Sequence, residues 1–215
     1  MPGIHVAQMS GVLETRPVSA ERDSPSPQSA YVNAVARLET TLAPLDLLDA
    51  LQAVEQQFGR IRRERWGART LDLDLLFFGG QILDLPRLTL PHPAAWYRRF
   101  VLDPLVEIAP DAIHPVKLVT IRELQSRLLH QPAKICFAGG DPALILSAIH
   151  TLRSEFPTIL FEPWAPGGEV TFIVWLGESS DPEFSRLPLV PRVQPYGPAS
   201  DPVGFVRVLI ASASL

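Results

Sequence analysis

Two aspartates, Asp72 and Asp74, alternate with leucines in the run LDLDL at residues 71–75. On an extended strand, residues two apart point to the same face about 7 Å from each other, so both carboxylates are expected on one side and the leucines in a core. Such a pair suits Mg²⁺, which binds one or two carboxylates together with substrate phosphates. A second interpretation stays open, in which the pair is an exposed strand face neutralised by nearby arginines.

An arginine-rich stretch lies directly before the aspartates. Its members are Arg60, Arg62, Arg63, Arg65 and Arg69. They are either a solvated basic loop or a binding surface for phosphates, whose oxygens guanidinium groups contact in a planar, bidentate way. Phosphoryl transfer needs charge neutralisation and alignment above all, so the stretch and the aspartates together indicate a polyphosphate site. A nuclease could use similar parts.

The elements that must position these groups follow from periodicity. A helix is expected from Pro44 to a stop at Gly59, because apolar residues repeat at helical spacing and Gln52 and Glu55 share its face. A second helix is expected from about Thr120 to Leu129, opened by a capping box. Strands are expected at Ile4–Thr15, Tyr31–Thr40 and Thr70–Phe78, and irregular structure between Gly80 and Pro93.

The composition shifts near residues 130–132, where we expect a boundary between domains at 1–130 and 131–215. The second domain reads as a small α/β unit. Its expected elements are strands at Lys134–Ala138, Thr158–Glu162 and Val170–Leu176, a helix from Asp141–Pro142 to Phe156, and a last helix from Asp201. No recognised chemistry lies in it, so structural or regulatory packing is the expected role.

The whole-chain composition excludes several classes of protein. The 215 residues carry a formal net charge of −4, which argues against a general nucleic-acid binder. No apolar run is long enough to span a bilayer, and the start MPGIHVAQMS is unlike a secretory signal. Cys136 is the one cysteine in the sequence, so a reducing, cytoplasmic location is expected.

Four fragments in order carry a resemblance to a known family. They are YVNA at 31–34, RWGARTLDLDLL at 65–76, PHP at 91–93, and RRFVL at 98–102 followed by PL and EIAP up to residue 110. Together they closely resemble the hydroxymethyl-dihydropterin pyrophosphokinases of folate biosynthesis, over roughly residues 4–129. The resemblance implies an α+β, ferredoxin-like antiparallel sheet with helices. It also implies transfer of pyrophosphate from ATP to 6-hydroxymethyl-7,8-dihydropterin without a covalent intermediate on the protein.

The resemblance also implies roles for individual residues. Asp72 and Asp74 would hold two Mg²⁺ ions that bridge the ATP phosphates, and Arg60 and Arg69 would act with them in catalysis. The ATP side would be formed by Gln52, Glu55, Arg62, Trp66, His92 and Arg98. The pterin side would be formed by Thr15, Val18, Tyr31, Asn33 and Phe100. Phe100 could instead be plain core, and His92, between two prolines, a turn residue.

The sequence departs from the family pattern at its start. A strand, a Gly-Ser-Asn turn and a helix are expected before Ile4, and their lack would leave the sheet incomplete and able to self-associate. Three explanations stay open: a start assigned too late, a remnant without full activity, or replacement by another segment or chain. Residues 134–161 offer such a segment, with strand, turn, helix and strand in order. The alternative function is therefore a non-catalytic pterin- or nucleotide-binding remnant with a regulatory C-terminal domain.

Overall fold

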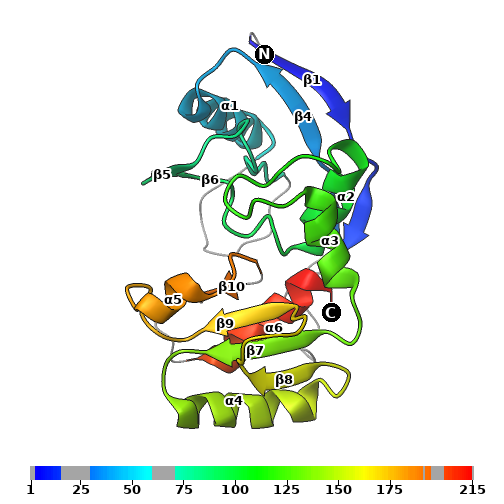
Figure 1. The fold of residues 1–215 in the computed structure, drawn as a ribbon. Coiled ribbons are helices and arrows are strands. Elements are labelled where there is room, and N and C mark those ends of the chain that lie inside the picture. Colours follow the sequence, from blue (N-terminus) through cyan, green and yellow to red (C-terminus); the bar gives the residue numbers. More distant parts are fainter. Residues whose placement is uncertain (1–2, 16–29, 60–70, 191, 195–200, 215) are drawn as a thin grey trace. The chain divides into compact units, whose positions relative to one another are not determined.

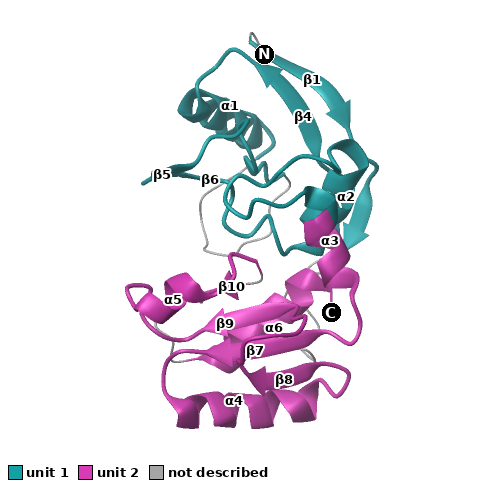
Figure 2. Cartoon of the chain, viewed as in Figure 1, with its two compact units in different colours: residues 1–17, 26–122 teal, residues 18–25, 123–215 magenta. Residues whose placement is uncertain are grey.

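The computed structural model describes residues 3–15, 30–59, 71–190, 192–194 and 201–214. These residues fall into two compact units, which change over between Arg122 and Glu123 (Figure 2). The expected boundary at residue 130 lies eight residues further on and remains a prediction. Within the described segments, no helix has the length and apolar character that crossing a bilayer requires.

Unit 1, up to Arg122, combines short strands with helices. Its elements are β1 (Ile4–Met9), β2 (Leu13–Thr15), β3 (Tyr31–Asn33), β4 (Ala36–Thr40), α1 (Pro44–Gln57), β5 (Leu83–Leu85), β6 (Leu88–Leu90) and α2 (Arg99–Ile108), and α3 (Ile121–Leu129) spans the change-over (Figure 1). The described strands pair antiparallel as β1–β4, β2–β3 and β5–β6. The content is α+β, and the described residues of this unit form three two-stranded sheets. The expected ferredoxin-like antiparallel sheet remains a prediction.

Two long strands expected from the sequence are each split in two. Ile4–Thr15 is interrupted between β1 and β2, and Tyr31–Thr40 is interrupted between β3 and β4. At this break the amide of Ser10 donates to the Val35 carbonyl at 2.9 Å, and the Ser10 hydroxyl accepts from the Val35 amide at 2.9 Å. The side chain therefore replaces one ladder hydrogen bond, which alternation alone does not reveal.

The strand expected at Thr70–Phe78 is wrong for its described part, Leu71–Phe78, which pairs with no strand. Its backbone is bonded elsewhere. The amide of Leu73 donates to a Glu55 carboxylate oxygen at 2.9 Å, and the Leu76 carbonyl accepts from the His92 amide at 2.9 Å. A strand requires a neighbouring strand for its ladder, and side-chain and loop partners take that place here.

The β5–β6 hairpin lies where irregular structure was expected. Its register pairs Leu83 with Leu90 and Leu85 with Leu88. A small core of Leu48 from α1 with Leu88 and Leu90 joins the helix to the hairpin, and Leu75, Phe78 and Leu83 pack on it. In Figure 1, α1 and β6 accordingly lie next to each other. This packing forms the frame of the site described below.

A buried histidine organises the loop before α3. His114 is 3% exposed, and its Nδ1 accepts from the amides of Val116 and Lys117, each at 3.2 Å. The ring meets Phe77 edge to face, with centroids 5.4 Å apart. Burial, and then the charge of Lys117, lower the pKa of His114 to about 4. The loop is therefore built around a neutral imidazole.

Unit 2 is an α/β layer around a parallel sheet in the order β10-β9-β7-β8 (Figure 1). Its elements are β7 (Lys134–Ala138), α4 (Pro142–Glu155), β8 (Leu160–Pro163), β9 (Phe172–Trp175), α5 (Pro182–Arg186), β10 (Arg192–Val193) and α6 (Pro202–Ala213). The expected N-cap is confirmed, since the Asp141 carboxylate accepts from the Ala143 amide at 2.9 Å. Because β7 pairs with β8 on one edge and β9 on the other, it does not supply a strand to a sheet of unit 1.

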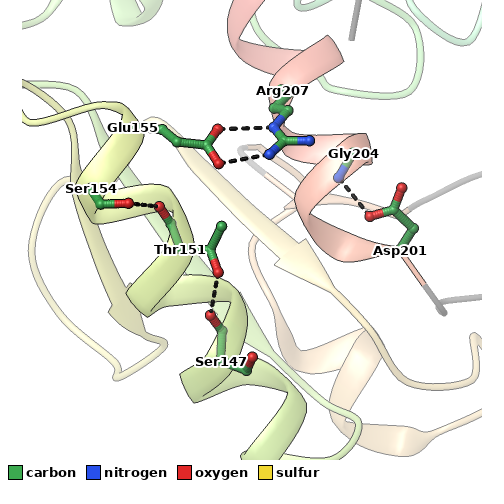
Figure 3. A network of polar contacts seen from close by, with 7 residues as sticks. All are labelled: Ser147, Thr151, Ser154, Glu155, Asp201, Gly204 and Arg207. Atoms are coloured by element: carbon green, nitrogen blue, oxygen red, sulfur yellow. Dashed lines mark hydrogen bonds and ion pairs between the residues drawn. The ribbon is translucent and has the colours of Figure 1, made fainter. Parts of the chain in front are cut away.

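Two features fix the packing of unit 2. A bidentate ion pair joins α6 to α4, with Arg207 Nε 2.9 Å and Nη2 2.6 Å from the two Glu155 oxygens (Figure 3). After β7, Gly139 adopts φ +67°, and a Cβ there would lie 2.9 Å from the indole of Trp175. Glycine is thus required at 139 both by conformation and by space.

Candidate functional site

Helix α1 carries one wall of the site on a single face. Leu48, Gln52 and Glu55 follow one another at spacings of four and three residues, which brings them onto the same side of a helix. Glu55 is 1% exposed, and one of its oxygens accepts from the amide of Leu73 at 2.9 Å. A buried carboxylate requires such donors, and this one is attached to the backbone between Asp72 and Asp74.

The segment after the arginine stretch carries the second wall. Asp72 and Asp74 are exposed, whereas Leu71, Leu73 and Leu75 are half-buried, so the expected alternation is confirmed although no strand forms. Both aspartates line a cavity of about 370 Å³, called the aspartate cavity below. Its lining residues are Leu48, Gln52, Glu55, Asp72, Leu73, Asp74, Leu75, Leu85, Pro86, Arg87, Leu88, Thr89, His92 and Pro93.

His92 closes the cavity beside the aspartates. Its amide donates to the Leu76 carbonyl, and its Nδ1 accepts from the Ala94 amide at 3.2 Å. Burial lowers the pKa of His92, and the charge of Arg98 lowers it further, whereas Asp74 and Asp72 act in the opposite direction. With Nδ1 accepting, a neutral ring carries its hydrogen on Nε2, which makes this atom a hydrogen-bond donor.

The hairpin β5–β6 adds two polar residues that the sequence reasoning missed, Arg87 and Thr89. Leu88 and Leu90 of β6 are buried, so the intervening Thr89 points to the opposite, exposed side. Arg87 precedes β6, and its Nη2 is paired with Oδ1 of Asp49 on α1. The alternation LDLPRLTL at 83–90 is the signal that could have predicted the hairpin, although not its place at the cavity.

The residues expected to bind the pterin form a separate group. In the β2–β3 pair, Leu13 is opposite Asn33 and Thr15 is opposite Tyr31. Nδ2 of Asn33 donates to the Thr15 hydroxyl at 2.8 Å. Helix α2, which carries Phe100, contacts both strands. The aspartate cavity is lined by none of the four described pterin-side residues, Thr15, Tyr31, Asn33 and Phe100.

Arg98 interacts with one residue of the pterin-side group and with one residue of the aspartate cavity. Its guanidinium carbon is 5.6 Å from the centroid of the half-buried Phe100 ring, and its charge acts on His92. Its Nε is buried without a hydrogen-bond partner among the described atoms. Five of the expected site residues lie outside the described part of the chain: Val18, Arg60, Arg62, Trp66 and Arg69.

The aspartate cavity offers carboxylates that a metal ion could bind. In the described segments, no group of three or more His, Cys, Asp or Glu side chains could hold an ion by itself. Asp72 and Asp74 nevertheless offer the one or two carboxylates that Mg²⁺ takes when substrate phosphates and water complete its shell. The cavity therefore fits the class of sites that bind a metal-chelated polyphosphate.

Comparison with known proteins agrees with this class. The family model described as 7,8-dihydro-6-hydroxymethylpterin-pyrophosphokinase (HPPK) matches residues 2–110, just over half of the 215 residues. The chain belongs to this family. Since the match runs from residue 2, it does not support the expectation that the family's opening elements are missing.

Three relatives share the name 2-amino-4-hydroxy-6-hydroxymethyldihydropteridine pyrophosphokinase. The Pseudomonas aeruginosa protein is 62% identical over 87 residues, which cover 40% of this chain and 54% of the relative. The Synechocystis protein is 54% identical over 98 residues, 46% of this chain and 50% of the relative. The Haemophilus influenzae protein is 47% identical over 111 residues, 52% of this chain and 66% of the relative. The chain thus spans about half to two thirds of the length of these relatives.

Proposed function

We propose that this chain transfers pyrophosphate from ATP to 6-hydroxymethyl-7,8-dihydropterin, and so produces AMP and the pterin diphosphate used in folate biosynthesis. The observation that carries the proposal is the aspartate cavity, in which Asp72, Asp74, Gln52, Glu55 and His92 meet. Each was expected to serve ATP or its metal, and family membership points to the same reaction. The alternative of a non-catalytic remnant has no observation in its favour.

Asp72 and Asp74 are proposed to hold the Mg²⁺ that accompanies ATP, with two ions expected. When bound, the metal offsets charge on the phosphate oxygens during transfer. The role of Glu55 is to hold the Leu73 amide, which sets the direction of both carboxylates. His92 offers its Nε2–H to a phosphate oxygen. Arg60, Arg62, Arg69 and Trp66 are proposed to complete the ATP side, and Arg98 joins them through His92.

The pterin is proposed to bind at the β2–β3 hairpin and α2. Asn33 is a suitable reader of the pterin because its amide offers both a donor and an acceptor to the edge of a heterocycle. One of its N–H groups is held by the Thr15 hydroxyl, which fixes the orientation of the amide. The aromatic ring of Phe100 offers a stacking surface, and Tyr31 and Val18 are proposed to lie at the same substrate.

The reaction needs no covalent intermediate on the protein. The hydroxymethyl oxygen of the pterin forms a bond to the β-phosphorus of ATP and releases its proton to solvent. The bond from the β-phosphorus to the oxygen that bridges to the α-phosphorus breaks, and AMP leaves with that oxygen. The protein contributes alignment of the two substrates and stabilisation of charge on the phosphate oxygens.

An assay of AMP release with ATP, Mg²⁺ and the pterin alcohol tests the proposal. Asp72→Ala and Asp74→Ala are expected to abolish turnover while the fold persists, because removal of one of two neighbouring like charges relieves repulsion. Asp111→Ala is the matched control, since it removes an exposed aspartate of unit 1 that does not line the cavity. Normal rates in either cavity variant would overturn the metal assignment.

Several further expectations remain predictions. A ferredoxin-like sheet is proposed for the complete family fold, and self-association could occur through open strand edges of unit 1. Unit 2 is proposed to have a structural or regulatory role. No role in binding nucleic acid or membranes is proposed, and a cytoplasmic location is expected from the single cysteine.

A further inference from the structure

We infer that Asp49 is a positioning residue, which holds the Arg87 guanidinium at the aspartate cavity so that its free N–H groups bind the nucleotide. This inference deepens the proposed function and rests on it, because the ligand of the cavity is taken to be Mg–ATP. Asp49 itself does not line the cavity and acts through Arg87.

Charge makes Arg87 distinctive in the cavity. Of the described lining residues it is the one arginine or lysine, whereas Glu55, Asp72 and Asp74 are acidic. A cation near these carboxylates offsets part of the repulsion that they exert on a polyanionic ligand. A guanidinium carries five N–H donors in a rigid fork suited to phosphate and other planar acceptors. Its orientation therefore matters more than that of a lysine would.

The ion pair uses a small part of this donor capacity. Asp49 accepts from Nη2 of Arg87, which leaves Nε and Nη1 for other acceptors. Asp49 precedes Gln52 by three residues on α1, so the pair fastens the arginine of the hairpin to the helix that carries the opposite wall. An arginine held in this way loses less side-chain entropy when a ligand arrives, because it is already ordered.

The exposure of the pair argues against a mainly structural role. The Arg87 and Asp49 side chains are 55% and 54% exposed, and ion pairs in that setting contribute little to stability. The hairpin is already joined to α1 by the buried leucines 48, 88 and 90. Removal of Asp49 should therefore leave the melting temperature near that of the wild type and change the binding of the nucleotide.

Positioning and simple electrostatics predict opposite results for Asp49→Ala. If the carboxylate acted through its charge alone, its removal would make the cavity more positive and tighten the binding of ATP. If it positions Arg87, its removal weakens the affinity for ATP by about three- to tenfold, because binding must then immobilise one more flexible side chain. Asp46→Asn is the matched control, since it removes a charge from the same helix without a lining or pairing role.

The experiment measures the KM for ATP, kcat, and the affinity for the α,β-methylene analogue of ATP with Mg²⁺ by calorimetry. Asp49→Ala should raise the KM and the dissociation constant about three- to tenfold at unchanged kcat, and Asp49→Asn, which keeps an acceptor oxygen, should recover part of the loss. Arg87→Ala should lower the affinity for the nucleotide about ten- to a hundredfold, as expected when a hydrogen bond to a charged group is lost. Asp46→Asn should resemble the wild type.

The exchanged variant, Asp49→Arg with Arg87→Asp, separates pairing from positioning. It restores an ion pair but places a carboxylate in the cavity, so its affinity should stay low while its melting temperature stays near that of the wild type. Equal or tighter binding by Asp49→Ala, or full affinity of the exchanged variant, would overturn the inference. Lack of any nucleotide binding by the wild type would instead overturn the proposed function, so the two failures are distinguishable.

Discussion

Removal of the Glu55 acceptor should uncouple the two aspartates from helix α1. Glu55 is 1% exposed and accepts from the Leu73 amide at 2.9 Å. Glu55→Ala leaves that amide without its partner, at a cost of about 1–3 kcal/mol in the free energy of unfolding. Because Leu73 lies between Asp72 and Asp74, both carboxylates should shift. A displacement of the order of 1 Å can lower the rate about a hundredfold.

Glu55→Gln is the informative companion, because its amide oxygen can still accept from Leu73. Urea unfolding and kcat/KM for ATP are to be measured for both variants, at a temperature where each is folded. Glu55→Ala should lose both stability and rate, and Glu55→Gln should keep most of both. If Glu55→Ala retained the wild-type kcat/KM, or if the two variants were equally impaired, the hydrogen bond to Leu73 would not be what positions the aspartates.

Three further predictions concern stability. The folded-state pKa of His114 is about 4, against an ordinary value of 6.5, so the stability that its neutral ring contributes is complete above pH 6.5 and is lost as the pH falls towards 4. At pH 5 the free energy of unfolding, measured in urea, should be lower by about 2 kcal/mol. Gly139→Ala should lower the free energy of unfolding, measured in urea, by about 2–4 kcal/mol, because strain at positive φ adds to a clash with Trp175. Arg207→Ala should cost about 1 kcal/mol in the thermal unfolding of unit 2, through its partly exposed pair with Glu155.

Each of these predictions has a control. His114→Gln should remove the pH-dependent loss between pH 6.5 and 4, and its persistence would assign the titration to another group. Gly168→Ala also lies at positive φ but has open space around it, so it should cost less than Gly139→Ala. Glu155→Ala combined with Arg207→Ala should cost about as much as the single variant, and additive losses would show that the pair does not act as a unit.

Strong local signals made parts of the fold predictable. The Asp141–Pro142 start of α4 combines a side-chain cap with a proline at the first helical position, and the structure has both. The alternation around Asp72 and Asp74 was equally informative about which side chains are exposed and which are half-buried. Local chemistry of this kind depends on residues close in sequence, and periodicity detects it.

Features that depend on distant partners were not predictable in the same way. The segment Leu71–Phe78 has the apolar alternation of a strand, but strand pairing also needs a neighbour, which no local pattern supplies. Arg87 was missed for a related reason, since the β5–β6 hairpin has strands of three residues joined by Pro86 and Arg87. Its place at the cavity becomes visible only when leucines of the hairpin pack on α1.

The fate of the β-phosphorus tests the central claim most directly. ATP labelled at the β-phosphorus is to be incubated with the wild-type chain, Mg²⁺ and the pterin alcohol, and the products separated. Intact pyrophosphate transfer places the label in the pterin product and leaves AMP unlabelled, and Asp72→Ala and Asp74→Ala should abolish this. Label found in ADP or in free pyrophosphate, with none in the pterin, would contradict the assignment.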